Sequence, residues 1–142
     1  MPNWCQNKLT INAPKEVLEK FINKHFNNQA EFDFATIIPE VYDDDGDTWY
    51  DWRIAHWGTK WNACDTEVAW YPDTLVINFN TAWSPSIEIT KKLFELYPDI
   101  EIEHSFYEGG VGIAGKFNNH MSMEPDDYEA FAEEEGFYAE LL

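Results

Sequence analysis

Two short motifs hold most of the residue types that could do chemistry in this chain. One reads Trp-Gly-Thr-Lys-Trp-Asn (residues 57–62), and the other reads Thr-Ala-Trp-Ser-Pro (residues 81–85). Indole rings can stack on a flat ligand, and a lysine beside them can contact an anion. With the polar start of the chain, the two motifs define a candidate pocket. Its members are Asn3, Trp4, Asn7, Trp57, Lys60, Trp61, Asn62, Thr81 and Trp83.

The same motifs have a structural interpretation, and the sequence leaves both open. Trp57, Trp61 and Trp83 could pin an inserted segment onto the core, while Asn and Thr side chains satisfy buried backbone groups. Catalysis would need a positioned acid, base or nucleophile. His56 and Cys64 lie near this region, but no nucleophile elbow or phosphate loop accompanies them. We therefore expect no enzymatic activity, no catalytic residue and no cofactor.

Metal and phosphate sites are not expected either. The histidines are dispersed along the chain, and His25 and His104 fall on apolar faces, where core histidines are found. The acidic run 43–47 resembles the start of a calcium loop, but its twelfth position is Ile54 instead of a glutamate. The glycine-rich stretch 108–112 lies between two expected strands, which favours a hairpin turn over a phosphate cradle.

Charge is the strongest signal in the composition. The chain has 27 acidic and 9 basic residues, for a net charge of −18. Such a charge repels nucleic acid and anionic membranes and attracts basic protein surfaces. Acidic runs are commonly solvated faces, but an acidic helix, rising about 1.5 Å per residue, can also imitate the charge spacing of duplex DNA, about 1.7 Å. The expected partner-binding surface comprises Asp43, Asp44, Asp45, Asp47, Asp126, Asp127, Glu129, Glu133, Glu134 and Glu135.

Hydrophobic periodicity predicts the elements that position these residues. Strands are expected at 3–12, 65–71, 74–81, 100–107 and about 111–118, and helices after Pro14 and from Ser84-Pro85 to Pro98. Pro72-Asp73 suits a type I turn between the second and third strands. The order predicts an α+β, ferredoxin-like (βαββαβ) antiparallel sheet with helices on one face and an extra C-terminal hairpin strand.

Two segments lie outside this repeat of strands and helices. In an insertion at about 30–62, residues 32–38 are expected to be extended, and the spacing of Trp49, Trp52, Arg53 and His56 predicts a short helix. An acidic amphipathic tail at 124–142 has Phe131 on its apolar face. We therefore expect a domain at 1–123 and a helical tail that packs on it or extends from it.

The bulk composition places the chain among globular proteins. A length of 142 residues fits one domain, and the aromatic fraction of 17% gives a core filled by rings. Two cysteines without a CxxC motif, and the lack of a signal peptide or long apolar run, indicate a cytoplasmic protein that does not enter membranes. The oligomeric state and the order of the tail stay undetermined.

Four motifs in order give the chain a family resemblance. Residues 1–11, 57–63, 81–85 and the Tyr-Glu-Gly-Gly turn at 107–110 resemble the YubB-type ferredoxin-like domain family of bacteriophage and conjugative-plasmid proteins. The resemblance covers about residues 1–118. It implies the same fold and a mobile-element origin inside a bacterial cell, and it implies no reaction and no iron–sulfur cluster.

The functional hypothesis follows from the charge. We expect a non-enzymatic accessory protein that binds a basic host protein, such as a restriction, CRISPR or other nucleic-acid-processing enzyme, as a DNA mimic. The alternatives are a small-ligand or catalytic protein that uses the candidate pocket, and a factor for particle or replication assembly. Direct nucleic-acid binding is disfavoured because the expected open face carries Gln6, Asn78, Asn80, Glu101 and Glu103 and no basic footprint.

Overall fold

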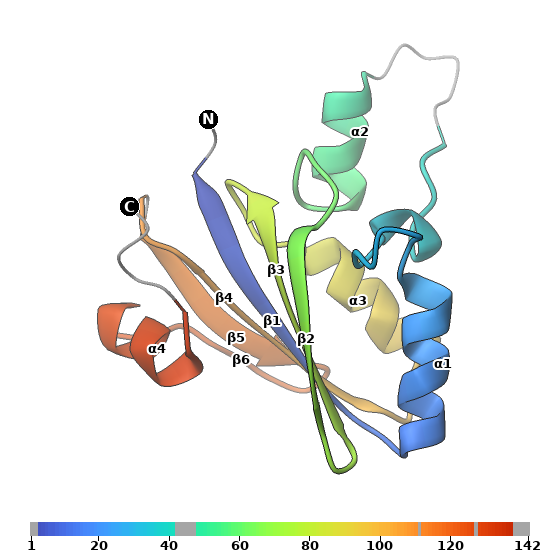
Figure 1. Cartoon of the computed structure of the whole chain (residues 1–142). Coiled ribbons are helices and arrows are strands. Elements are labelled where there is room, and N and C mark those ends of the chain that lie inside the picture. Colours follow the sequence, from blue (N-terminus) through green and yellow to red (C-terminus); the bar gives the residue numbers. More distant parts are fainter. Residues whose placement is uncertain (1–2, 42–47, 111, 127, 138–142) are drawn as a thin grey trace.

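The chain folds into one antiparallel sheet with helices on both sides (Figure 1). The computed structural model describes residues 3–41, 48–110, 112–126 and 128–137, so the acidic run 43–47 and Asp127 lie outside the described residues. The strands are β1 (Trp4–Asn12), β2 (Cys64–Tyr71), β3 (Thr74–Ala82), β4 (Glu101–Glu108), β5 (Ile113–Asn118) and β6 (Ser122–Met123), and the helices are α1 (Lys15–His25), α2 (Trp49–His56), α3 (Ile87–Leu96) and α4 (Tyr128–Glu135).

The strand order confirms the predicted ferredoxin-like topology. The order across the sheet is β2-β3-β1-β4-β5-β6, and β1 pairs antiparallel with both β3 and β4. The first four strands with α1 and α3 therefore make two interlocked βαβ halves, in which β1 and β3 are central. The strands β5 and β6 extend the sheet beyond β4.

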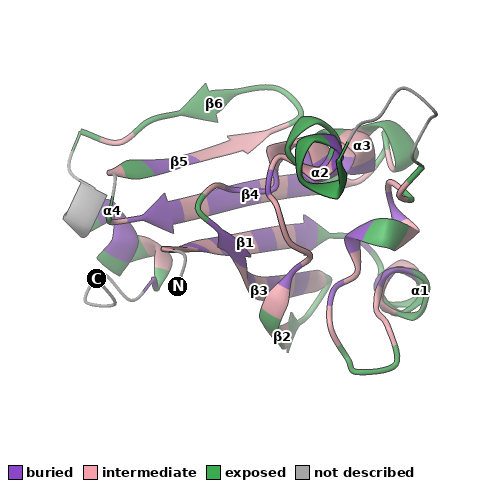
Figure 2. Ribbon diagram, turned by 90° about the horizontal axis from the view of Figure 1, so that it is seen from above, coloured by how far each residue is buried: buried purple, intermediate pink, exposed green. Residues whose placement is uncertain are grey.

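The main core lies between the sheet and the helices α1 and α3. In β1, alternate side chains from Cys5 to Ile11 are buried, while those between them are only half-buried. Leu18 and Phe21 of α1 and Leu93 of α3 meet this buried face. The purple central strands in Figure 2 show the same layer from above. Alternation on β1 thus separates a dry helix-facing side from an open side.

The insertion departs from the prediction at its start. Residues 34–36 form a short 3₁₀ turn instead of an extended piece, because the Asp33 carboxylate accepts a hydrogen bond from the Ala35 N–H and so caps the turn. The helix α2 begins after Thr48, whose hydroxyl accepts from the Asp51 N–H. Trp57 follows it, buried in the core, and its indole N–H donates to the Ile38 carbonyl at 2.9 Å.

Three turns refine the sequence-based assignment. Asp73 has a φ of 57°, which fits a type II turn at Pro72-Asp73, so the predicted type I turn is wrong. The helix α3 begins at Ile87, later than predicted, because the Ser84 hydroxyl bonds to the Gly58 carbonyl instead of capping a helix. The Glu108 carboxylate accepts from the Gly110 N–H at 2.7 Å, as expected for a hairpin turn.

The helix α4 lies on the face of the sheet opposite to α1 and α3 (Figure 1). Phe131, Ala132 and Phe137 form a small apolar cluster there with Tyr107 and Ala114. This cluster is separate from the main core. The C-terminal helix is therefore a satellite element on the otherwise open side of the sheet.

Candidate functional site

The two tryptophan-containing motifs meet and hold each other through hydrogen bonds. The Thr59 hydroxyl donates to the Ala82 carbonyl at 2.8 Å, and the Ser84 hydroxyl donates to the Gly58 carbonyl at 2.6 Å. Gly58 has a φ of 85°, and a Cβ there would lie 3.1 Å from the Pro85 carbonyl. The polar groups at this junction are thus used inside the protein.

The aromatic members of the candidate pocket do not converge on one cavity. Trp57 is in the core, whereas Trp83 is 45% exposed with a φ of 70°. Trp4 and Trp61 lie together, with ring centroids 6.0 Å apart, and the Lys60 ammonium lies 4.3 Å from the Trp61 ring centroid. A flat ligand would find one partly buried indole pair here and no enclosed floor.

The asparagines of the candidate pocket also have structural partners. The Asn62 Oδ1 atom accepts from the Phe34 N–H at 2.9 Å, and its Nδ2 atom donates to the Asp33 carboxylate at 2.9 Å. The Asn3 carbonyl accepts from the Trp83 N–H at 2.8 Å. Asn62 therefore fixes the start of the insertion, and Asn3 ties the chain terminus to the end of β3.

Asn7 and Thr81 belong to a buried chain of hydrogen bonds. Thr90 Oγ1 lies 2.8 Å from His104 Nδ1, and His104 Nε2 lies 2.8 Å from Asn7 Oδ1. Asn7 Nδ2 donates to Thr81 Oγ1 at 2.9 Å, and that hydroxyl donates to the Ser84 carbonyl at 2.6 Å. Because Asn7 Oδ1 can only accept, the histidine carries its proton on Nε2 and accepts from Thr90 on Nδ1.

The two core histidines are uncharged. Burial lowers the pKa of His104 to about 3. Burial, with a contribution from Lys24, lowers the pKa of His25 to about 4. His25 bonds to the Thr36 and Tyr97 hydroxyls at 2.9 and 2.7 Å. Both are satisfied core side chains, as their apolar positions predicted.

The cysteines are poor nucleophiles. Burial raises the pKa of Cys5 to about 12, and the Thr81 hydroxyl opposes this only in part. Burial, with Asp65 and Glu31 nearby, also raises the pKa of Cys64. Since the thiolate is the reactive form, neither thiol is activated at neutral pH. Among the described residues, no group of three or more His, Cys, Asp or Glu side chains is placed to hold a metal ion.

One acidic residue of the tail, Glu135, forms ion pairs with two lysines of the sheet. Glu135 Oε2 lies 2.5 Å from the Lys8 ammonium, which also donates to the Glu135 carbonyl at 2.9 Å. The Lys116 ammonium lies 3.3 Å from Glu135 Oε1. Partial burial raises the pKa of Glu135, but bonds and charges from the two lysines outweigh this, so its pKa lies below its usual value. Glu135 is thus an anchor for α4, which the sequence pattern did not reveal.

Several of the other described tail carboxylates face solvent. Glu133 and Glu134 of α4 are exposed, and so is Asp126, which precedes the helix. Glu129 also lies in α4. The structure therefore gathers part of the predicted acidic surface on one short helix.

The charge on the α4 side of the sheet differs from that of the helices α1 and α3. The helices α1 and α3 are nearly neutral, since they carry five lysines and four glutamates. On the opposite side, the strand register places Glu67, Glu101 and Glu103 on the same face as Lys8, beneath or beside α4. The described lysines of that face, Lys8 and Lys116, are the ones paired with Glu135. The side that carries α4 is consequently an acidic side, and the insertion next to α1 and α3 is acidic as well, with Glu31, Asp33, Glu40 and Asp51 against Arg53 and Lys60.

The antiparallel sheet and the order of its strands and helices define a ferredoxin-like α+β protein. Residues 56–140 match the family described as "Ferredoxin-like domain in Api92-like protein", and the chain belongs to that family. The crystal structure of the protein api92 from Yersinia pseudotuberculosis is similar, with a TM-score of 0.70, 10% identity, and coverage of 89% of this chain and 99% of that one. At this identity the likeness shows the fold alone.

A comparison with curated proteins found no match. Within the described ranges, no helix combines the length and apolar character needed to cross a membrane.

Proposed function

We propose that this protein is a non-enzymatic accessory protein that binds a basic, nucleic-acid-binding host protein through its acidic side. The observation that carries the proposal is that Lys8 and Lys116 are paired with Glu135 and Glu103. The carboxylates of Glu133 and Glu134 are exposed on α4. An acidic surface attracts the groove in which such a partner holds DNA or RNA. The protein then acts as a DNA mimic that inhibits a restriction, CRISPR or other nucleic-acid-processing enzyme.

The biological setting is part of the same proposal. The resemblance of the four motifs to YubB-type proteins supports an origin on a phage or conjugative plasmid and a cytoplasmic place of action in a bacterium. A partner-occupying role requires no catalytic residue, which agrees with the raised pKa of both cysteine thiols and with the core positions of His25 and His104. The hypothesis of a ligand pocket has less support than the acidic surface, because the polar side-chain atoms of Asn62 and Thr81 form hydrogen bonds within the protein.

The test is retention of host proteins on the immobilised protein as salt is raised. A bacterial lysate is applied at low ionic strength and eluted with increasing NaCl, and duplex DNA is added as a competitor. We expect retained proteins to bind nucleic acid, to compete with DNA, and to elute as the Debye length falls from about 30 Å at 0.01 M to about 8 Å at 0.15 M salt.

Matched variants separate a specific acidic surface from bulk charge. Glu133→Gln with Glu134→Gln should weaken retention by about tenfold, because each removes a charge from the proposed interface. Glu16→Gln with Glu95→Gln makes the same change in net charge on α1 and α3 and should have little effect. Equal losses in the two double variants, or retention that salt and DNA do not alter, would refute the proposal.

A further inference from the structure

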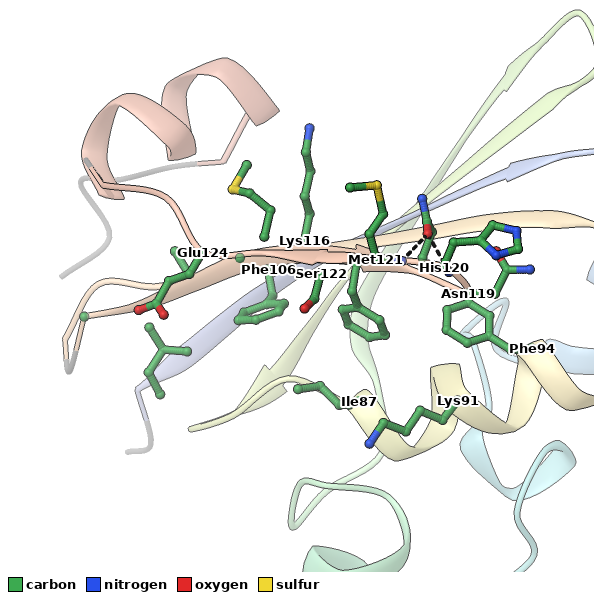
Figure 3. A pocket seen from close by; sticks show the side chains of 17 residues that line it. Ile87, Lys91, Phe94, Phe106, Lys116, Asn119, His120, Met121, Ser122 and Glu124 are labelled. Atoms are coloured by element: carbon green, nitrogen blue, oxygen red, sulfur yellow. Dashed lines mark hydrogen bonds between the residues drawn. The ribbon is translucent and has the colours of Figure 1, made fainter.

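The sheet ends in two edges of unequal length. The outer strands are β2 and β6, and Figure 2 shows them at opposite ends of the sheet. The strand β6 consists of Ser122–Met123. The Asn118 carboxamide closes the turn before it by accepting from the His120 and Met121 N–H groups, beside a groove between α3 and β6 (Figure 3). The strand β2 has eight residues, so it is the edge that can pair with another strand.

Hydrogen bonds between β1 and β3 determine which backbone groups of β3 face β2. At one end of this strand pair the Ala13 N–H donates to the Asp73 carbonyl, and at the other end the Trp83 N–H donates to the Asn3 carbonyl. In an antiparallel pair, such bonded positions recur at every second residue. In the register of β1 and β3, the odd-numbered residues of β3 therefore bond to β1, and the even-numbered residues face β2.

The same alternation shows which backbone groups of β2 are free. From residue 67 to residue 71, its odd-numbered residues lie opposite even-numbered residues of β3 and bond to them. The N–H and C=O groups of Val68 and Trp70 therefore point away from the sheet, and no hydrogen bond from another described residue reaches them. This free edge is limited on both sides. The Thr66 N–H already donates to the Glu31 carboxylate at 3.1 Å, and Pro72 has no N–H.

Apolar side chains line the free edge. Val68 is 38% exposed and lies opposite buried Ile77, which places it on the α1 side of the sheet. Trp70 shares that side, is 48% exposed, and lines a hollow of about 540 Å³ between α1 and the end of the hairpin. Edge strands that stay unpaired commonly carry lysine, proline or a bulge at such positions. The bulge of β2 lies before Glu67, so residues 68–70 keep an unprotected edge.

One antiparallel register pairs the free edges of two copies so that every outward N–H meets an outward carbonyl. With Ala69 opposite Ala69 of the second copy, Val68 of each copy is bonded to Trp70 of the other. A shift of two residues in one direction sets Val68 against Pro72, which cannot donate. A shift in the other direction sets Trp70 against Thr66, whose N–H is already bonded. The backbone therefore selects one two-fold symmetric register.

The side chains fit the same register. On the α1 side, Val68 would pack on the Trp70 ring of the second copy, and the two-fold symmetry makes this contact twice. On the other side, Glu67 would lie opposite Tyr71 of the second copy, whose hydroxyl can donate to the carboxylate. The small Ala69 lies at the axis, so the two strands can approach closely. The register thus joins apolar to apolar side chains and keeps the two Glu67 carboxylates apart.

We infer that two copies of this chain associate through β2 and form one continuous antiparallel sheet across a two-fold axis. The short β6 edge does not offer a second long strand, so association stops at the dimer instead of continuing as a fibre. The helix α4 packs on Tyr107 and Ala114, which belong to β4 and β5. The dimer contact therefore lies apart from the proposed partner surface, and this inference does not rest on the proposed function.

Charge gives this association a distinctive salt dependence. Each copy carries a net charge of −18, and Asp65 and Asp73 of different copies would lie near each other at the ends of the shared ladder. Salt screens this repulsion, so the dimer should be tighter at high ionic strength. Binding of a basic partner to α4 should weaken under the same change, which distinguishes a failure of one proposal from a failure of the other.

Sedimentation equilibrium of the full chain measures the dimer at about 0.15 M and about 1 M NaCl, where the Debye lengths are about 8 Å and about 3 Å. We expect a monomer–dimer equilibrium whose dissociation constant falls by at least about threefold at the higher salt. Val68→Pro removes an outward N–H and leaves the bonds to β3 intact, so it should weaken the dimer by at least about tenfold. A chain that stays monomeric at every concentration would leave the edge to a strand of a different protein and would overturn the inference.

Two matched variants separate pairing at this edge from nonspecific association. Trp70→Ser and Trp83→Ser each remove an indole of similar exposure, 48% and 45%. Trp70→Ser should weaken the dimer by about tenfold, because Val68 of the second copy loses its contact, and Trp83→Ser by less than about twofold. Equal losses in the two variants would mean that the copies do not meet at β2.

Disulfide trapping tests the register itself. In a Cys64→Ser background, Ala69→Cys places two thiols at the axis, where directly opposed Cβ atoms lie about 4.5–5.5 Å apart, close to the span of a disulfide. Glu67→Cys places them on the same face but about four residues, or about 13 Å, apart along the ladder. With oxidised glutathione as the oxidant, we expect Ala69→Cys to cross-link at least about tenfold faster. Equal rates, or a dimer that Val68→Pro does not weaken, would contradict the inferred pairing.

Discussion

At the residue scale, the hydrogen-bond chain from Thr90 to Ser84 ties the second half of the fold to the first. It passes through His104 on β4, Asn7 on β1 and Thr81 on β3, so it joins three adjacent strands beneath α3. Each buried donor in the chain has an acceptor. Leaving a single member unsatisfied would cost about 1–3 kcal/mol, which is a large part of the stability of a small domain.

The buried histidines predict that stability falls at mildly acidic pH. The pKa of His104 is about 3 in the folded chain and about 6.5 when exposed, so below pH 6.5 the unfolded state binds the extra proton. The contribution of the uncharged His104 to the free energy of unfolding is therefore fully present above about pH 6.5. It decreases as the pH falls toward 3, by about 2 kcal/mol between pH 7 and pH 5. His25, whose pKa is also lowered by burial, acts in the same direction.

Urea unfolding at pH 7, 6 and 5 measures this effect. His104→Gln should lower the stability at pH 7 but make it less dependent on pH, because one titrating group is lost. His120→Gln changes an exposed histidine and should leave the dependence as in the parent chain. An unchanged pH slope in His104→Gln would contradict the role assigned to this side chain.

At the element scale, the sequence predicted what local patterns determine and missed what distant contacts determine. Alternation along β1 and the apolar stripe of α3 are among the local patterns that predicted the βαββαβ order. The start of α3 was predicted too early, because the partner of the Ser84 hydroxyl is Gly58, which lies 26 residues away. The spacing of a Ser-Pro pair carries no information about such a partner.

For the candidate site, too, the sequence indicated which segments matter but not which distant residues they contact. The residues of the two motifs do meet in the folded chain. The sequence did not indicate, however, that the Thr59 and Ser84 hydroxyls donate to backbone carbonyls. Glu135 was singled out for its charge, and its pairing with Lys8 joins residues 127 positions apart. An acidic run fixes the sign of a surface, whereas the choice of which carboxylate anchors the helix is made by tertiary packing.

The helix α4 should open more often when its anchor is neutralised. Glu135→Gln removes the charge that pairs with Lys8 and Lys116 but keeps the shape of the side chain, so the helix would be held by the apolar cluster around Phe131 and by the bond from Lys8 to the backbone carbonyl of residue 135. We expect faster hydrogen exchange at the Phe131 and Ala132 amides, by about tenfold, with a loss of about 1 kcal/mol or less in global stability.

Glu134→Gln is the matched control, because Glu134 is the exposed neighbour and the change in net charge is the same. It should leave exchange in α4 within about twofold of the parent chain. Equal acceleration in both variants would mean that α4 responds to total charge and that Glu135 is no special anchor.

At the scale of the whole molecule, the two proposals use different parts of the surface. The side with α4 collects negative charge over the open sheet, whereas the helices α1 and α3 are themselves nearly balanced, and an apolar groove lies beside α3. Pairing of two copies uses backbone groups at the β2 edge of the sheet, whereas the proposed partner surface uses carboxylates of α4. The two proposals are therefore independent, and either can fail without the other.

The net charge of −18 should make the protein more stable as salt is added. Compact packing brings the carboxylates closer together than in the unfolded chain, so screening relieves more repulsion in the folded state. The described ion pairs weaken with salt, but surface pairs contribute only about 0–1 kcal/mol each, so the surplus charge dominates. We expect the Tm to rise by about 3–6 °C between 0.01 and 0.15 M NaCl, corresponding to about 1 kcal/mol. Differential scanning calorimetry measures this, with sucrose at equal osmolality as the control for solute effects unrelated to charge. A Tm that falls with salt would show that the ion pairs around Glu135 outweigh the repulsion, and that the acidic side is held together by its own lysines.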